Sequence, residues 1–249
     1  DMKTIVRKRY LERIKALKDT PDIKIITGIR RSGKSNLMQA YINYLKSEFE
    51  DVNIIFIDFM DLEFEEIKEY HALHKYVEDR YDKEKQNYLF VDEVQLCPNF
   101  ELAINSLYSK NKYDIYITGS NAFLLSADLA TLFTGRYIEI HMFPFSFKEY
   151  CEYYSDQADK DKLFDEYFIK GGLAGSYAYN TDLDRTTYIK EVYETIVNRD
   201  LVQKYNLPDT QVLRQLSEFL MDNISNLTSP NRVSDILTAN EVPTNHVTI

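Results

Sequence analysis

The feature that most constrains this chain is the run GIRRSGKS at residues 28–35, which fits the pattern GxxxxGK(S/T) in full. A β-branched run precedes it at residues 23–27, and a helical segment containing Leu37, Met38 and Ala40 follows it. The two glycines allow successive backbone N–H groups to converge on one anion, and the positive end of the following helix faces the same point. Strand, loop and helix occur in the order that a phosphate-binding loop requires, so we expect such a loop here.

Strand-like and helix-like segments alternate around this loop. Short runs rich in β-branched and aromatic residues predict five buried strands, at residues 23–27, 52–58, 88–92, 114–118 and 137–142. Helical segments separate the strands, at residues 35–49, 62–82 and 100–110. Apolar strands that alternate with helices are typical of a parallel sheet covered on both faces. We therefore predict an α/β fold, a P-loop NTPase core with a parallel five-stranded sheet.

The pattern changes after Pro144, where aromatic helical segments replace the strand-like runs. Ser146 and Glu149 have the spacing of a capping box, which begins a helix by satisfying two free backbone N–H groups. The predicted domains are an N-terminal basic amphipathic helix (residues 1–19), the P-loop core (residues 20–143), a helical lid (residues 144–205) and the start of a C-terminal helical region (residues 206–249).

Composition excludes several classes of protein. The formal net charge of −10 argues against a protein that coats nucleic acid through bulk positive potential. Cys97 and Cys151 lie far apart and beside no histidine, so neither a zinc knuckle nor a disulfide framework is expected. No apolar run reaches the roughly 18 residues that a membrane span needs. We therefore expect a cytoplasmic protein without a membrane partner.

Two segments predict the chemistry of the phosphate site. Lys34 is expected to reach the β and γ phosphates of ATP, and the Ser35 hydroxyl to bind the Mg²⁺ ion that bridges them. The apolar run YLFVDE at residues 88–93 ends in two carboxylates, of which Asp92 would hold Mg²⁺ and Glu93 would activate the attacking water. The residues expected to line the nucleotide are Gly28, Ile29, Arg30, Arg31, Ser32, Gly33, Lys34, Ser35 and Asn36.

A third buried strand, at residues 114–118, ends in the small polar residues of the segment TGSN. Either Ser120 or Asn121 would orient the attacking water beside Glu93, and either would equally cap the helix that follows. We assign the catalytic role to Asn121 as a prediction and keep Ser120 as the alternative.

These motifs, together with TGRY at residues 134–137 and PFSFKE at residues 144–149, resemble the widespread prokaryotic AAA-type ATPases that carry a C-terminal domain of unknown function. The resemblance covers nearly the whole chain. In AAA ATPases, an arginine just before the last core strand serves as the arginine finger of a neighbouring subunit, and Arg136 occupies that place. The resemblance therefore implies a homo-oligomer in which Arg136 completes the site of its neighbour.

The C-terminal region points to a further partner. Residues 234–237 and 243–246 resemble the opening helices of a winged helix, which implies a longer native protein and a DNA or protein partner. Residues 206–249 carry more acidic than basic side chains, which weakens the case for contacts to nucleic-acid phosphates.

Three functions remain open at this stage. The leading one is Mg²⁺-dependent hydrolysis of ATP to ADP and phosphate, coupled to a partner. The second is a nucleotide-gated regulatory switch that hydrolyses ATP slowly while its C-terminal region binds DNA or protein. The third is a P-loop kinase, which the adjacent Asp92 and Glu93 disfavour because a kinase activates an acceptor hydroxyl instead of water.

Overall fold

The computed structural model describes residues 6–120, 126–154, 159–202 and 210–239. The chain divides into two compact units, residues 1–190 and 191–249.

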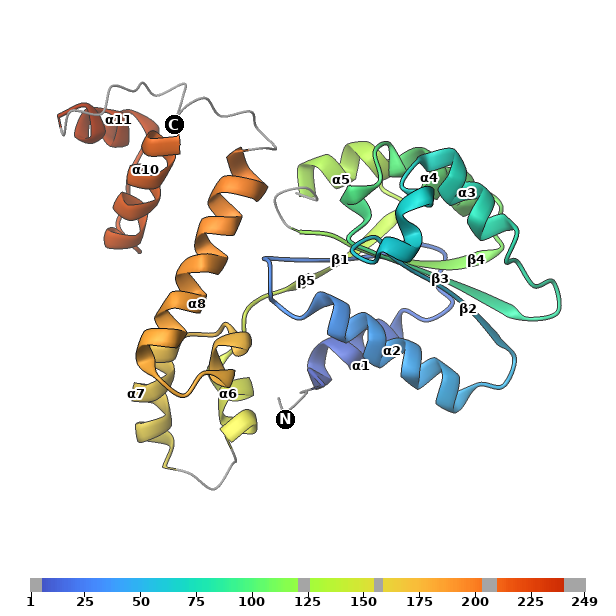
Figure 1. Cartoon of the computed structure of the whole chain (residues 1–249), viewed down its shortest axis with the longest axis horizontal. Coiled ribbons are helices and arrows are strands. Elements are labelled where there is room, and N and C mark those ends of the chain that lie inside the picture. The colour runs from blue at the N-terminus through green and yellow to red at the C-terminus, as the bar shows by residue number, and fades with distance from the viewer. Residues whose placement is uncertain (1–5, 121–125, 155–158, 203–209, 240–249) are drawn as a thin grey trace. The chain divides into compact units, whose positions relative to one another are not determined.

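The first unit is built on a sheet of five parallel strands (Figure 1). They are β1 (Ile23–Gly28), β2 (Val52–Asp58), β3 (Gln86–Asp92), β4 (Tyr113–Thr118) and β5 (Tyr137–Met142), in the spatial order β2-β3-β4-β1-β5. The predicted fold class is confirmed, and β2 and β5 have the predicted bounds. The order places β4 between β1, which leads into the glycine-containing loop, and β3, which ends in Asp92.

Helices cover both faces of the sheet (Figure 1). On one face α1 (Lys8–Ala16) and α2 (Lys34–Glu48) pack against Tyr88, Phe90 and other alternate strand residues. On the other face α3 (Tyr70–Glu78), α4 (Phe100–Ser109) and α5 (Ser126–Phe133) cover Leu89, Val91 and their neighbours. Consecutive residues of one strand therefore enter opposite cores, and each large apolar side chain contributes about 1.5–3 kcal/mol by burial. This two-sided burial explains why the strands are almost continuously apolar.

The single helix predicted over residues 62–82 is wrong. The structure has a 3₁₀-helix, η1 (Leu62–Ile67), followed by α3. The Asp61 side chain accepts a hydrogen bond from Glu63 N at the start of η1, and the Glu69 carboxylate accepts from His71 N and Ala72 N at the start of α3. The Asp61 and Glu69 side chains thus each begin a separate short helix. Each accepts hydrogen bonds from backbone N–H groups that would bond to backbone carbonyl oxygens in one continuous helix.

After β5, within the predicted lid, the chain forms a small helical cluster that is called the lid below, made of α6 (Phe147–Tyr154), α7 (Lys160–Lys170) and η3 (Ala174–Ala178). Its core contains Phe145, Tyr150, Cys151, Leu163 and Tyr177. The predicted capping box is present at the start of α6. Glu149 Oε2 accepts from Ser146 N at 2.9 Å, and Glu149 N donates to Ser146 Oγ at 3.4 Å.

The remaining elements are helical. The helix α8 (Asp182–Thr195) ends the first unit and begins the second, where it continues into a π-helix, η4 (Ile196–Val202). The helices α10 (Thr210–Asp222) and α11 (Pro230–Ala239) meet through buried Val212 and Val233. The second helix proposed at residues 243–246 lies outside the described residues. Among those that are described, no helix combines the length and apolar character needed to cross a membrane.

Both cysteines are free and buried, which predicts slow thiol chemistry. Burial raises the pKa of the Cys97 thiol to about 11, and the nearby Glu69 and Glu101 charges act in the same direction. Because the thiolate is the nucleophile, Cys97 should react with a chromogenic disulfide at pH 8 at least about tenfold more slowly than an exposed cysteine. Cys151 should also react slowly, because its burial limits access of the reagent. Unfolding in guanidinium should release two reactive thiols. Fast reaction of one thiol in the native protein, traced with Cys97→Ser and Cys151→Ser, would contradict the packing described here.

Candidate phosphate-binding site

The phosphate-binding loop, residues 28–35, runs from the end of β1 into α2 and requires its first glycine. Gly28 has φ 150°, and a Cβ there would lie 2.4 Å from the Met142 carbonyl oxygen and 2.7 Å from Ser32 Oγ. Neither approach is possible for a carbon atom, so no larger residue fits. Arg31 (φ 67°) and Gly33 (φ 95°) also adopt left-handed backbone conformations, which bend the loop tightly before α2 begins.

Lys34 is held inside this loop. Its side chain is buried, and Nζ donates to the carbonyl oxygens of Gly28 at 3.1 Å and Ile29 at 3.2 Å. The ammonium group therefore lies against the loop backbone at the start of α2, where the helix dipole also favours an anion. Ser35 and Asn36 are exposed in the first turn of α2.

The other loop side chains differ in exposure. Arg31 is exposed, whereas Arg30 and Ile29 are half-buried. Ser32 is buried, and its hydroxyl has no hydrogen-bond partner among the described residues. A buried polar atom without a partner costs free energy unless a ligand satisfies it, so this hydroxyl fits a site for a polar ligand.

The carboxylates lie at the same edge of the sheet. Asp92 is buried at the end of β3, and its Oδ1 accepts from Glu93 N at 3.2 Å and from Thr118 Oγ1. Glu93 is half-buried and has a left-handed backbone conformation, with φ 52°. The Asp92 carboxylate at the end of β3 and the Ser35 hydroxyl at the start of α2 are oxygen ligands of the kind that Mg²⁺ prefers, so the chemistry of these residues fits the predicted ion.

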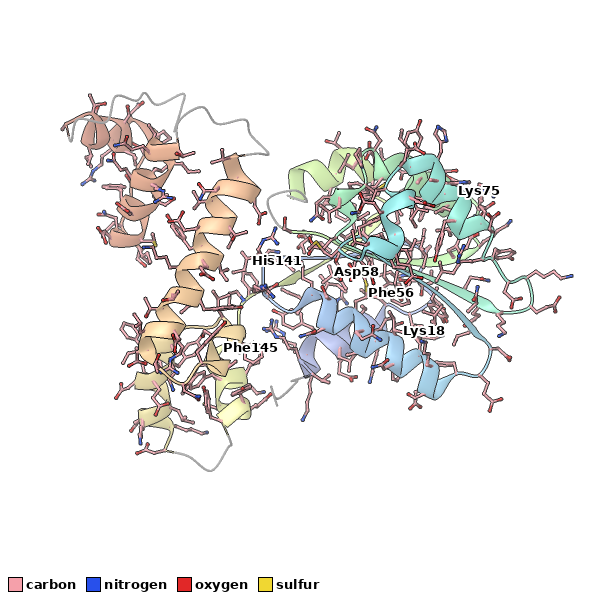
Figure 2. All side chains as sticks on the ribbon, in the orientation of Figure 1. Lys18, Phe56, Asp58, Lys75, His141 and Phe145 are labelled. Carbon is pink, nitrogen blue, oxygen red and sulfur yellow. The ribbon has the colours of Figure 1, made fainter. Side chains whose placement is uncertain are left out.

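A third carboxylate, Asp58, is the last residue of β2 (Figure 2). It pairs in register with Asp92 on β3. Burial raises the pKa of Asp58 above its ordinary value, and the charge of Asp92 adds to the increase, although the hydrogen bond from Met60 N opposes it. The carboxyl ends of β2 and β3 thus bring acidic groups together, at the same end of the parallel strands as the loop that follows β1.

In the segment TGSN, Gly119 and Ser120 follow β4, the strand that lies between β1 and β3. Ser120 is buried, with no hydrogen-bond partner for its hydroxyl among the residues that the structure describes. Asn121, the predicted catalytic residue of this segment, lies outside the described residues. Gly119 N donates to Ile26 O at 3.3 Å, which holds the segment against β1. Ser120 thus follows β4, the strand between β1 and β3, and its role in orienting the attacking water stays a prediction.

Arg136 does not join this site within one chain. It precedes β5 at Tyr137, which pairs with Ile23 at the start of β1, whereas the phosphate-binding loop begins where Gly28 pairs with Met142. At about 3.3 Å per residue, the two ends of β5 lie roughly 17 Å apart. Arg136 is exposed, and its guanidinium carbon lies 5.8 Å from the centroid of the Tyr108 ring. Its role as the arginine finger of a neighbouring subunit stays a prediction.

Sequence reasoning missed three residues of this region. Thr118, fully buried at the end of β4, bonds both Asp92 Oδ1 and, at 3.0 Å, Glu93 N. The Gln95 side-chain nitrogen donates to Glu93 Oε2 at 2.5 Å. Arg7 contacts the phosphate-binding loop and the lid. A polar residue ending an apolar strand was a usable signal for Thr118, but nothing local distinguishes Arg7 from its basic neighbours.

Comparison with known proteins agrees with this geometry. A family model described as an AAA domain matches residues 20–151. The chain belongs to this AAA domain family. The AAA chain is 34% identical over 98% of its length to an uncharacterized protein of Haemophilus influenzae, of which it covers 62%. It is 26% identical over 86% of its length to an uncharacterized protein of Methanocaldococcus jannaschii, of which it covers 50%. The chain therefore spans less than two thirds of these relatives.

Two solved structures are similar to the AAA chain. AMPPCP-bound DnaA from Aquifex aeolicus superposes with a TM-score of 0.45 and 16% identity, over 90% of this chain and 73% of that one. PCH-2 of C. elegans gives a TM-score of 0.45 and 12% identity, over 76% of this chain and 66% of that one.

Proposed function

We propose that this AAA chain binds ATP together with Mg²⁺ and hydrolyses ATP to ADP and phosphate. One observation carries the proposal. A buried lysine in a loop that requires glycine and two consecutive carboxylates lie at the same end of the sheet, the carboxyl end of its parallel strands. Lys34 supplies the positive charge for the phosphates, and Asp92 and Glu93 follow β3. Family membership supports nucleotide binding, and the carboxylates extend the proposal to hydrolysis.

Each residue has a distinct task in this proposal. Lys34 leaves the carbonyl oxygens of the loop to bind the β and γ phosphates. Ser35 and Asp92 hold Mg²⁺, which when bound neutralises charge on the phosphate oxygens. Glu93 accepts a proton from the attacking water, and Thr118 fixes the orientation of Asp92. Ser120 or Asn121 orients the water.

The contact between Gln95 and Glu93 favours a second candidate function. Gln95 Nε2 donates to Glu93 Oε2 at 2.5 Å, which occupies an oxygen of the proposed base. In a nucleotide-gated switch this bond would keep Glu93 from activating water, so that Gln95→Ala would raise the rate of hydrolysis. In a steadily active ATPase the bond would orient Glu93, and the same substitution would lower the rate.

Nucleotide binding is tested with Lys34→Ala. We expect its ATP affinity, measured by calorimetry with Mg²⁺, to be at least about tenfold weaker than that of the unaltered protein, because charged hydrogen bonds to phosphate are lost. Lys46→Ala is the matched control, since Lys46 is exposed in the last turn of the same helix, α2. Equal affinity in Lys34→Ala and Lys46→Ala would contradict the assignment of the loop.

Hydrolysis and its partners are tested by phosphate release over a series of protein concentrations, with and without duplex DNA. Turnover per subunit that rises with concentration would support a homo-oligomer completed by Arg136 from a neighbouring subunit. Stimulation by DNA would assign a nucleic-acid partner, and its absence would favour a protein partner. Undetectable turnover with tight ATP binding would favour the switch.

A further inference from the structure

Arg7 precedes α1 and is buried although it carries a charge, with 5% of its side chain exposed. Its guanidinium donates to three backbone carbonyl oxygens. Nη1 donates to Ser32 O at 3.1 Å and to Phe143 O at 2.6 Å, and Nη2 donates to Pro144 O at 3.3 Å. Ser32 belongs to the phosphate-binding loop, whereas Phe143 and Pro144 lead from β5 into the lid. One side chain therefore joins two segments that are distant in sequence.

The same guanidinium also binds the lid helix α6. Nε donates to Glu149 Oε1 at 2.6 Å and Nη2 donates to Glu149 Oε2 at 2.8 Å, which is the paired geometry that arginine forms with carboxylates. Burial by itself would raise the pKa of the Glu149 carboxyl, but the bonds from Arg7 and from Ser146 N hold that pKa below its ordinary value. Glu149 is therefore charged and fixed between the Arg7 side chain and the first turn of α6.

Two aromatic rings complete the surroundings of this charge. The Arg7 guanidinium carbon lies 4.5 Å from the centroid of the Tyr10 ring and 4.9 Å from that of Phe145. Phe145 lies where the chain passes from β5 into α6 (Figure 2). The Phe145 backbone is itself fixed, because its N–H donates to Gly172 O at 2.7 Å and its carbonyl accepts from Tyr167 OH at 2.7 Å. Only a planar group with several N–H donors, such as the Arg7 guanidinium, can make these hydrogen bonds and ring contacts together, so lysine would not replace arginine here.

The bond from Arg7 to Ser32 O has a direct consequence for anion binding. The Ser32 carbonyl and the Gly33 N–H belong to one planar trans peptide unit, so they point in opposite directions. Whatever holds the carbonyl also sets the direction of the N–H. Gly33 is the N-cap residue of α2, and its N–H is one of the groups that a phosphate-binding loop presents to its ligand. By binding the Ser32 carbonyl, Arg7 thus fixes the direction of the Gly33 N–H, and it does so from the side of the peptide that faces away from the ligand.

We propose that Arg7 is a positioning residue that orients the Ser32–Gly33 peptide for phosphate and connects that peptide to the lid through Glu149. Rotation of this peptide on nucleotide binding changes the bond to Arg7, and Arg7 passes the change to α6. The lid therefore responds to the phosphate-binding loop through Arg7 and Glu149. This inference rests on the proposed binding of ATP.

The test compares Arg7→Lys with Arg9→Lys, a matched control because Arg9 is exposed on α1. Two properties are measured, the ATP affinity and the hydrogen exchange of backbone amides in residues 28–36 and 147–154, without nucleotide and with Mg²⁺-ATP. Both variants keep the positive charge, and thermal melting establishes that they are folded. We expect Arg7→Lys to bind ATP about tenfold more weakly, because lysine cannot make the paired and backbone bonds together.

The exchange data separate positioning from simple stabilisation. In the unaltered protein and in Arg9→Lys, ATP should slow exchange in both segments. In Arg7→Lys, saturating ATP should still slow exchange in residues 28–36 but should no longer change residues 147–154. Glu149→Gln should produce the same loss of response in the lid. An unchanged ATP affinity together with an unchanged response of residues 147–154 in Arg7→Lys would overturn the proposal.

Failure of the proposed function gives a different result. If the unaltered protein binds no ATP, the ATP-binding proposal fails, and the exchange of nucleotide-free protein still tests the connection. Residues 147–154 should then exchange at least about threefold faster in Arg7→Lys than in Arg9→Lys, because the lid has lost its fixed carboxylate partner. Equal exchange in these two variants would overturn the connection itself.

Discussion

Replacing Glu93 with glutamine is expected to lower the rate of phosphate release from ATP at least about a hundredfold, because a positioned general base typically contributes 10²–10⁴ in rate. Glutamine has nearly the shape of glutamate, but it cannot accept the proton of the attacking water. Asp92 and the phosphate-binding loop are unchanged, so ATP affinity should stay within about threefold of the unaltered protein. Single-turnover phosphate release and calorimetry measure the two quantities separately.

The control for this substitution is Glu66→Gln, which makes the same chemical change at an exposed position after β2. It should release phosphate at the rate of the unaltered protein. If Glu93→Gln kept more than about a tenth of the original rate, Glu93 would not be the base. Asp58, the other half-buried carboxylate at this edge, would then be the group to examine.

The sequence predicted those parts of the fold that depend on residues close together in the chain. The five strands follow from apolar runs that both cores bury, and the phosphate-binding loop follows from Gly28, which no other residue can replace beside the Met142 carbonyl. The division of residues 62–82 into two helices was not predicted. It depends on caps at Asp61 and Glu69, and in a segment with many acidic residues the sequence does not show which of them will cap.

Two of the three residues that the sequence did not reveal, Arg7 and Thr118, act over long separations. Arg7 and Glu149 form their ion pair across 142 positions of the chain, and Thr118 reaches Asp92 across 26. Arg7 has basic neighbours in a segment typical of an amphipathic surface helix, and only the fold shows that Arg7 is buried and its neighbour Arg9 exposed. Local patterns specify the loop that binds phosphate, whereas the groups that orient the loop depend on tertiary structure.

The largest loss of stability is expected at the opposite edge of the sheet, from Asp114→Ala. Lys24 is fully buried in β1, and its Nζ donates to Asp114 Oδ1 at 2.5 Å and to Thr20 O at 2.5 Å. Removing the carboxylate leaves a buried ammonium group without its counter-charge. We expect the free energy of unfolding in urea to fall by about 3–5 kcal/mol, the range found when one partner of a buried ion pair is removed.

Two further variants show whether the loss comes from the unpaired charge. Lys24→Met combined with Asp114→Ala should recover much of the stability, because no buried charge then remains. Lys75→Ala breaks an exposed pair with Asp79 on the surface (Figure 2) and should cost less than about 1 kcal/mol. Because Lys24 and Asp114 lie near the amino ends of β1 and β4, folded Asp114→Ala should bind ATP like the unaltered protein. A loss below about 1 kcal/mol in Asp114→Ala would mean that the Lys24 ammonium group finds water or another partner. The amino ends of β1 and β4 would then not be a site on which stability depends, in contrast to the carboxyl ends, which are proposed to bind phosphate.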